Sequence, residues 1–150
     1  MDEAKPARRS AHRTQWAAQF AVASELCKRG YEVAFTMGNH PNADLLIISP
    51  GGASFAVDVK GLYTKNVWAV KEKPHKSGLY YVLAFVPNDK PNQFFILTQE
   101  ELNSECGDET SRSRQRRLKK GYTDEKIYAL PGIPWAYALK YQDKWSTLPV

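Results

Sequence analysis

The sequence contains few cysteines and no long hydrophobic run, and each shortage excludes a class of protein. Its two cysteines, Cys27 and Cys106, are too few for a disulfide framework or a four-ligand zinc site, so we expect both to be reduced thiols. The longest apolar run, residues 79–86, is far shorter than the ~18 residues of a membrane span. The polar first residues lack the apolar core of a signal peptide. We therefore expect a cytoplasmic protein with no membrane partner.

The composition is typical of one folded domain with a basic surface. The chain has 150 residues, of which 43% are hydrophobic and 25% charged, enough apolar material for a single core. Its 21 Lys and Arg against 16 Asp and Glu give a net charge of +5, which suits a polyanionic partner. Residues 1–12 have an early proline and no hydrophobic period, which predicts a mobile basic tail before a domain over residues 13–150.

Hydrophobic periodicity predicts one helix followed by several strands. Residues 13–29 carry an apolar stripe at helical spacing that ends at Gly30. The stripe consists of Trp16, Phe20, Ala23 and Cys27. Runs of β-forming residues separated by turn residues predict six strands. These runs are residues 31–36, 43–49, 53–60, 66–71, 79–86 and 93–98. The expected fold class is α/β (α+β), with a mixed or antiparallel sheet.

The second half of the chain is predicted to begin with a helix and continue into a basic segment. Thr98 and Glu101 have the spacing of a capping box, which predicts a helix start. Residues 107–121 contain only Leu118 as an aliphatic anchor, so we expect this segment to be exposed and mobile. Its cations are Arg112, Arg114, Arg116, Arg117, Lys119 and Lys120. They either contact phosphates or form a solubilising loop. After a turn at residues 130–134, four apolar anchors should dock onto the core: Trp135, Leu139, Tyr141 and Trp145.

The hairpin of residues 43–60 brings two carboxylates together. A turn centred on Gly51 pairs residues whose numbers sum to 102, which places Asp44 opposite Asp58. Lys60 shares a face with Asp58 because side chains alternate along a strand. Like charges across a strand pair are destabilising, so a cation is expected between them. Lys60 supplies part of that charge, and Mg²⁺, which prefers oxygen ligands, suits the remainder. The alternative is an exposed and nearly neutral Asp58–Lys60 ion pair.

Glu25 is a candidate third carboxylate on the first helix. It lies on a side that carries small residues, Ala18, Ala21 and Val22, which would let it approach the sheet. A glutamate delivered there to Asp44 and Asp58 would complete an acidic cluster. The alternative is a surface ion pair between Glu25 and Arg29, four residues later on the same helix.

The ordered set of these residues resembles the PD-(D/E)XK nuclease superfamily, over residues 13–98. Glu25 is similar to the helix glutamate of that family, and Asp44 to the aspartate that begins a strand. Residues 58–60 (Asp-Val-Lys) are similar to its (D/E)XK element. The helix followed by RGYEV, and the DVKG end of the later strand, are most similar to the compact Mrr-like and Holliday junction resolvase-like branch. The chain departs from the pattern in one respect, since Pro41 precedes Asp44 by three positions instead of one.

The resemblance implies a fold, a metal and an activity. The fold would be a restriction-endonuclease-like core, a helix and then a mixed central sheet flanked by helices. Asp44, Asp58, the Val59 main-chain carbonyl and Glu25, directly or through water, would bind Mg²⁺, with Mn²⁺ as a substitute. Lys60 would orient the attacking water. The activity would be hydrolysis of DNA by a structure-selective or restriction-type endonuclease.

The residues leave other functions and partners open. A silent nucleic-acid-binding or assembly module, or an RNA-directed phosphoesterase, would use the same fold. A chain this short has little room for a separate domain that reads sequence, so specificity would come from nucleic-acid structure, from a protein partner or from a homodimer.

Overall fold

The computed structural model describes residues 7–123 and 131–150 and has a mixed α/β architecture. Helix α1 comes first and is followed by the strands of the central sheet and by helix α2. Their bounds are α1 Ala11–Lys28, β1 Glu32–Phe35, β2 Leu45–Ile48, β3 Ser54–Leu62, β5 Leu79–Phe85, β6 Gln93–Thr98 and α2 Gln99–Lys119. A small second sheet and the C-terminal turns complete the chain. These are β4 Val67–Trp68, β7 Ile133–Pro134, α3 Trp135–Ala138, η2 Leu139–Tyr141 and η3 Trp145–Thr147.

The central sheet is mixed, as the sequence predicted. Its strand order is β1-β2-β3-β5-β6, and only the β3–β5 pair is parallel. The β2–β3 hairpin has the predicted register, with Leu45 opposite Val57 and Ile48 opposite Ser54. The connection from β3 to β5 contains residues 66–73, which we name the strap. It holds β4, which pairs with β7 and not with the central sheet, so the strand expected at residues 66–71 is short and separate.

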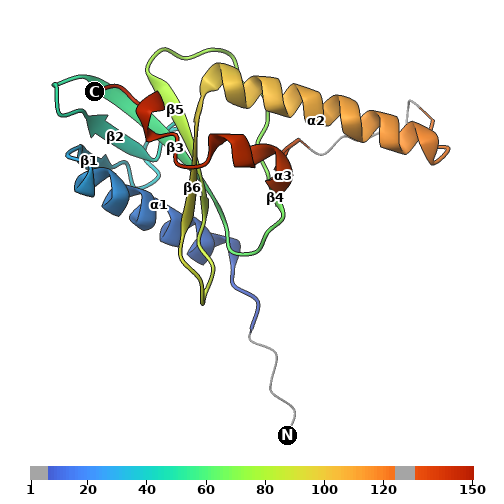
Figure 1. Cartoon of the computed structure of the whole chain (residues 1–150), viewed down its shortest axis with the longest axis horizontal. Helices are drawn as coiled ribbons and strands as arrows, with labels where there is room; N and C mark the ends of the chain where they lie inside the picture. The colour runs from blue at the N-terminus through green and yellow to red at the C-terminus, as the bar shows by residue number, and fades with distance from the viewer. Residues whose placement is uncertain (1–6, 124–130) are drawn as a thin grey trace, which may run out of the picture.

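The two faces of the central sheet are covered by different helices (Figure 1). Helix α1 packs on one face, where Val57 and Val59 of β3 are buried. Helix α2, β4, β7 and α3 cover the part of the other face that β5 and β6 form. Because side chains alternate along a strand, Asp58 and Lys60 point to the α2 side. The side chains of Asp58 and Lys60 therefore lie on the opposite side of the sheet from α1.

The buried face of α1 differs from the predicted apolar stripe. Of the predicted stripe Ala23 is buried, but Phe20 is 56% exposed and Cys27 is exposed, and the other buried apolar positions are Ala18, Val22 and Leu26. The physical reason is the close approach of α1 to β3. A Cβ atom at Gly61 would lie 2.8 Å from the Ala18 Cβ, so only small side chains fit at this contact. Phe20 packs instead against other aromatic rings, stacked on Trp16 of α1 and tilted against Phe35 of β1.

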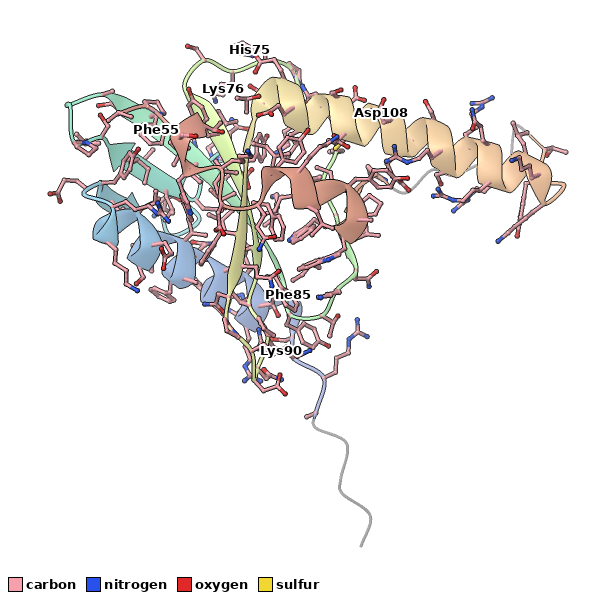
Figure 2. All side chains as sticks on the ribbon, in the orientation of Figure 1. Phe55, His75, Lys76, Phe85, Lys90 and Asp108 are labelled. Atoms are coloured by element: carbon pink, nitrogen blue, oxygen red, sulfur yellow. The ribbon has the colours of Figure 1, made fainter. Side chains whose placement is uncertain are left out.

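Helix α2 begins with the predicted capping box and is longer than expected. The Thr98 hydroxyl accepts a hydrogen bond from the Glu101 N–H, and the Glu101 carboxylate accepts one from the Thr98 N–H. The helix continues to Lys119, so most of the segment at 107–121 is helical and not a mobile loop. Long charged side chains have good helix propensity, which explains the difference. The second half of α2 projects beyond the rest of the molecule, and nitrogen-tipped side chains extend from it (Figures 1 and 2).

The ends of the described chain are attached to the core. Helix α1 begins at Ala11, and the Arg9 guanidinium donates to the Val86 carbonyl and the Asn88 side chain, so residues 7–12 do not form a detached tail. Residues 1–6, the rest of the expected tail, lie outside the described part. At the C-terminus three of the four predicted anchors pack inward, but Leu139 is 47% exposed. In the described ranges no helix is long and apolar enough to cross a bilayer.

Candidate metal and nuclease site

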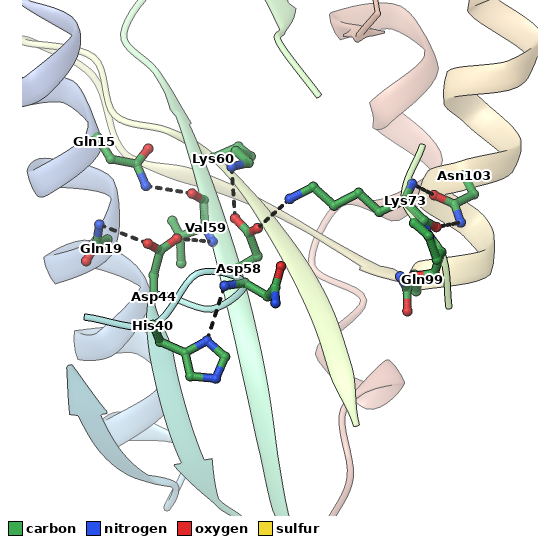
Figure 3. A network of polar contacts seen from close by, with 12 residues as sticks. Gln15, Gln19, His40, Asp44, Asp58, Val59, Lys60, Lys73, Gln99 and Asn103 are labelled. Atoms are coloured by element: carbon green, nitrogen blue, oxygen red, sulfur yellow. Dashed lines mark hydrogen bonds and ion pairs between the residues drawn. The ribbon is translucent and has the colours of Figure 1, made fainter. Parts of the chain in front are cut away.

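The site lies at the edge of β3, where β2 has ended. The β2–β3 ladder stops at the pair of Leu45 and Val57, so the main chain of Val59 has no strand partner on that side. Side chains take the place of the missing strand. The Asp44 carboxylate accepts a hydrogen bond from the Val59 N–H (Oδ2 to N, 2.8 Å), and the Gln15 amide donates to the Val59 carbonyl (2.6 Å) (Figure 3). The open strand edge is therefore lined by a carboxylate and a carbonyl oxygen.

Asp58 is the buried acid of the site. Its side chain is 6% exposed, with the Lys60 Nζ 3.1 Å from Oδ1 and the Lys73 Nζ 3.9 Å from Oδ2 (Figure 3). Burial raises the pKa of Asp58 above its ordinary value, Lys60 opposes that rise, and the negative charge of Asp44 adds to it. The ionised form of Asp58 is thus less stable than in water, even between two lysines. A further cation beside Asp44 and Asp58 would stabilise it.

Lys73 is a site residue that the sequence pattern did not place beside Asp58. It comes from the strap, thirteen positions after Lys60 and outside any strand. Its main chain is held on α2 by Asn103, which accepts from the Lys73 N–H (3.2 Å) and donates to the Lys73 carbonyl (2.9 Å). This pair of hydrogen bonds positions the Lys73 side chain toward Asp58. No local pattern predicts such a contact, because it depends on the packing of α2 against the strap.

Glu25 does not lie at the carboxylate pair, which corrects the sequence-based expectation. It forms ion pairs with Lys28 (3.7 Å) and Arg29 (3.8 Å), the alternative interpretation of this residue. The residue of α1 that reaches Asp44 is Gln19, whose amide nitrogen lies 3.4 Å from Oδ1. Six helical residues separate Gln19 from Glu25, which amounts to about 9 Å along the axis and roughly 240° around it. The two side chains therefore face different surroundings.

The signal for Gln15 and Gln19 was present in the sequence. Both are polar, they are four residues apart, and they flank the small residue Ala18, so they lie on the helix face that packs on β3. Gln19 is buried although it is polar. Because a carboxylate, Glu25, was expected to reach Asp44 from α1, these two amides were not predicted as site residues.

Tyr81 lies beside Asp58 on the adjacent strand. The two residues are register partners in the parallel β3–β5 pair, and their side chains share a face. The Tyr81 side chain is buried, as its apolar strand predicted, but its hydroxyl has no hydrogen-bond partner among the described residues. Burial and the charge of Asp58 raise the pKa of Tyr81 to about 12, so the hydroxyl keeps its proton at neutral pH.

The oxygen atoms at the β3 edge have the chemistry that Mg²⁺ prefers. Asp44 and Asp58 offer carboxylate oxygens, and the Val59 carbonyl has a second lone pair beside the one that Gln15 occupies. Apart from its ion pair with Lys60, Asp58 Oδ1 is buried without a hydrogen bond in the described structure. The same ranges contain no group of three or more His, Cys, Asp or Glu side chains able to hold a metal. A bound Mg²⁺ would therefore retain several waters, which is usual for this ion.

The basic residues predicted on residues 112–120 divide into two groups. Arg112 and Arg116 form ion pairs with the buried Glu109, at 2.9 Å and 2.7 Å, and Arg112 also lies over the Tyr137 ring. These two arginines stabilise the helix and its contact with α3. The other cations are Arg114, which lies between these two, and Arg117, Lys119 and Lys120, which lie at the projecting end of α2.

Comparison of the chain with protein-family models, with curated protein sequences and with solved structures found no match.

Proposed function

We propose that this protein is a Mg²⁺-dependent nuclease that hydrolyses phosphodiester bonds of DNA. One observation carries the proposal. At the open edge of β3 the Asp44 carboxylate binds the N–H of Val59, the residue after the buried Asp58, and the Lys60 Nζ lies 3.1 Å from the Asp58 carboxylate. Two carboxylates and a carbonyl lone pair are suited to hold Mg²⁺, and a lysine beside them is suited to stabilise charge on a phosphate.

Each residue has a role that follows from its position. Asp44, Asp58 and the Val59 carbonyl would hold Mg²⁺ or Mn²⁺, which, when bound, supplies a more acidic water and offsets negative charge on the phosphate. Lys60 is close enough to Asp58 to hold the attacking water by a hydrogen bond and to stabilise charge that develops on the phosphate oxygens. Gln15 and Gln19 keep the Val59 carbonyl and the Asp44 carboxylate in place.

The proposal includes membership of the PD-(D/E)XK superfamily, in the compact Mrr-like and Holliday junction resolvase-like branch. The order of Asp44 and the Asp58-Val59-Lys60 element on a helix-then-sheet core supports it. In this chain Gln19 would occupy the place of the helix glutamate, in contrast to the predicted Glu25. One chain provides one such site, so cutting both strands of a duplex would require a homodimer, and a protein partner would be a second source of specificity.

A second candidate function is nucleic-acid binding without hydrolysis. Two observations favour it: Lys60 and Lys73 already neutralise much of the charge of Asp58, and Glu25 does not supply a third carboxylate. In such a protein the acids would be structural and the basic surface would hold the partner. Metal-dependent cleavage separates the two functions.

The test is cleavage of a labelled panel in Mg²⁺ or Mn²⁺, with duplex, single-stranded, flap, four-way junction and RNA substrates. The control is Lys60→Met, which keeps the length of the side chain and removes its charge. We expect the parent to cut at least one DNA substrate, and the variant to cut it about 10²-fold or more slowly. If the parent binds the panel but cuts nothing, the binding module replaces the nuclease. Cleavage of RNA alone would assign an RNA-directed phosphoesterase.

Replacing Gln19 with glutamate should strengthen the response to metal. The substitution places a third carboxylate where the Gln19 amide now lies 3.4 Å from Asp44. We expect a lower Tm than the parent in EDTA, because like charges repel, and a larger rise in Tm with millimolar Mg²⁺. Differential scanning fluorimetry measures both. Glu25→Gln is the matched control and should leave the Mg²⁺ response unchanged. A response that changes in the control and not in the Gln19 variant would return Glu25 to the site.

A further inference from the structure

A basic cleft lies between the strap and α2, next to the carboxylate site. Its volume is about 690 Å³. Its described lining includes five cations and one carboxylate, Glu109. The cations are Lys60, Lys71, Lys73, Arg116 and Arg117. Lys60 and Lys73 also pair with Asp58, so the cleft and the candidate metal site share two side chains and are continuous.

The carboxylate in the cleft does not cancel its positive charge. Glu109 is buried and accepts ion-pair contacts from Arg112 and Arg116, so its charge is already matched. Lys71 is exposed and Arg117 is half-buried, and no ion pair joins either of them to a carboxylate within residues 7–123 and 131–150. These two cations are therefore available to an anion that enters the cleft.

Tyr81 provides an unused hydrogen-bond donor in the lining of the cleft. Its side chain is 1% exposed, and its hydroxyl has no partner in the described part of the chain. A buried hydroxyl without a partner costs stability, so such groups are rare unless a ligand or water pairs with them. Tyr81 shares a strand register with Asp58, which places this donor beside the candidate metal site.

The walls of the cleft are fixed before any ligand arrives. Asn103 of α2 holds the main chain of Lys73 with two hydrogen bonds, and the Cys106 thiol lies 3.7 Å from the Val70 carbonyl. At the other end of the strap, Trp68 in β4 pairs with Ile133 in β7. A cleft that is formed in advance loses little conformational entropy when it binds.

We propose that this cleft binds a backbone phosphate of an unpaired nucleic-acid strand and leads that strand to Asp58. This inference rests on the proposed nuclease function and names its substrate class. A space of this size holds a ligand of one or two nucleotides and is far too small for a duplex segment. Lys71, Arg117 and the Tyr81 hydroxyl bind the phosphate, and Lys60 connects that subsite with the site of hydrolysis.

The test compares two double variants with equal loss of charge. Lys71→Gln with Arg117→Gln removes the two available cations of the cleft. Lys119→Gln with Lys120→Gln removes two cations of the same helix end that do not line the cleft. Fluorescence anisotropy measures the Kd of a labelled 12-nucleotide single strand in EDTA, which excludes cleavage. We expect the cleft variant to bind about tenfold or more weakly than the control, and its salt slope to flatten by about 1.4 if both cations touch phosphates.

A third variant tests the hydroxyl separately from charge. Tyr81→Phe should retain or raise the Tm, since it removes a buried donor without a partner, and should bind the single strand several-fold more weakly.

On a blunt duplex of the same sequence the cleft and control double variants should bind alike. Equal binding of the single strand by cleft and control variants, or an effect as large on the blunt duplex, would overturn the proposal.

The cleft and the nuclease proposals fail in different ways. If the parent cuts DNA but the cleft variants bind single strands like the control, the cleft proposal is wrong and the nuclease stands. If the cleft variants lose single-strand binding but the parent cuts nothing in metal, the cleft is a subsite of a binding module and the nuclease proposal is wrong.

Discussion

Asp58→Asn is expected to lower metal-dependent cleavage by at least about 10³-fold while raising the Tm of the metal-free protein at neutral pH. The loss of cleavage follows from the proposed role of Asp58, which would hold the metal ion beside Lys60. The gain in stability follows from the removal of a buried charge whose pKa burial has raised. The two lysines left behind are 34% exposed and stay hydrated. A variant that is damaged in folding would instead show a lower Tm together with the loss of cleavage.

The pH dependence of this gain has a definite sign. A carboxyl with a raised pKa in the folded protein binds more protons there than in the unfolded chain. The contribution of Asp58 therefore lowers the free energy of unfolding as the pH rises from 3.8, the ordinary pKa of this carboxyl, to the raised pKa. Above that range the destabilisation has reached its full size. We expect the difference in Tm between Asp58→Asn and the parent to be largest at neutral pH and to vanish at pH values below 3.8.

Millimolar Mg²⁺ adds a second readout to the same variant. It should raise the Tm of the parent, because it binds the folded site, and should leave the Tm of Asp58→Asn unchanged. Asp89→Asn, an exposed aspartate between β5 and β6, is the charge-matched control and should respond like the parent. Cleavage by Asp58→Asn at the parental rate would remove Asp58 from the active site.

Gly61→Ala is expected to destabilise the fold and to disturb the site together. The new Cβ would lie 2.8 Å from the Ala18 Cβ and 3.0 Å from the Thr14 carbonyl oxygen, and neither atom belongs to a flexible side chain. Helix α1 must move away from β3, at a cost of about 1–3 kcal/mol. Gln15 and Gln19 move with the helix, so their contacts with Val59 and Asp44 weaken. Denaturant unfolding measures the first effect and cleavage rates measure the second.

Gly107→Ala is the matched control for this prediction. Its new Cβ would meet the Glu72 carboxylate, which is the end of a flexible side chain and is able to move. Alanine is the better helix former, so this substitution in α2 should stabilise the protein by up to about 1 kcal/mol. If Gly61→Ala proves as stable and as active as the parent, the tight contact between α1 and β3 is not a requirement of the site.

The sequence predicted those parts of the molecule that depend on neighbouring residues. The turn at Gly51 and the alternation of Phe55, Val57 and Val59 determine the hairpin register, which ends at the Leu45–Val57 pair, next to Asp44 and Asp58. The capping box at Thr98 determines where α2 begins, because its hydrogen bonds join residues three apart. In each case the pattern that carries the information is contained within a short segment.

The apolar stripe of α1 was predicted wrongly in part because a large apolar side chain was taken as a sign of burial. Phe20 is large and apolar, yet the contact with Gly61 admits only small residues, so Ala18 is buried and Phe20 is exposed. Glu25 was placed toward the sheet for a different reason, the small residues on its side of the helix, but it lies seven residues, about two turns, beyond Ala18 and pairs with Lys28 and Arg29. The small residues Ala18 and Val22 do lie on the buried face, but they did not indicate that Asp44 lies at the level of Gln19 on the helix.

Contacts between distant segments were beyond any local pattern. Lys73 reaches Asp58 because Asn103 of α2 holds the strap, and Lys73 and Asn103 are 30 positions apart. The pairing of Glu109 with Arg116 likewise depends on the basic segment being helical. The sequence identified the residue types of the site, and the structure adds the cations and amides that surround them.

The most direct test of the account is a single-turnover cleavage time course with the best DNA substrate of the panel. The parent and Asp58→Asn, purified identically, are compared at excess protein in Mg²⁺ and in EDTA. The account predicts product with the parent in Mg²⁺ alone, and none with the variant or in EDTA over the same time. Equal product from parent and variant, or product in EDTA, would show that Asp44, Asp58 and Lys60 are not a metal-dependent nuclease site.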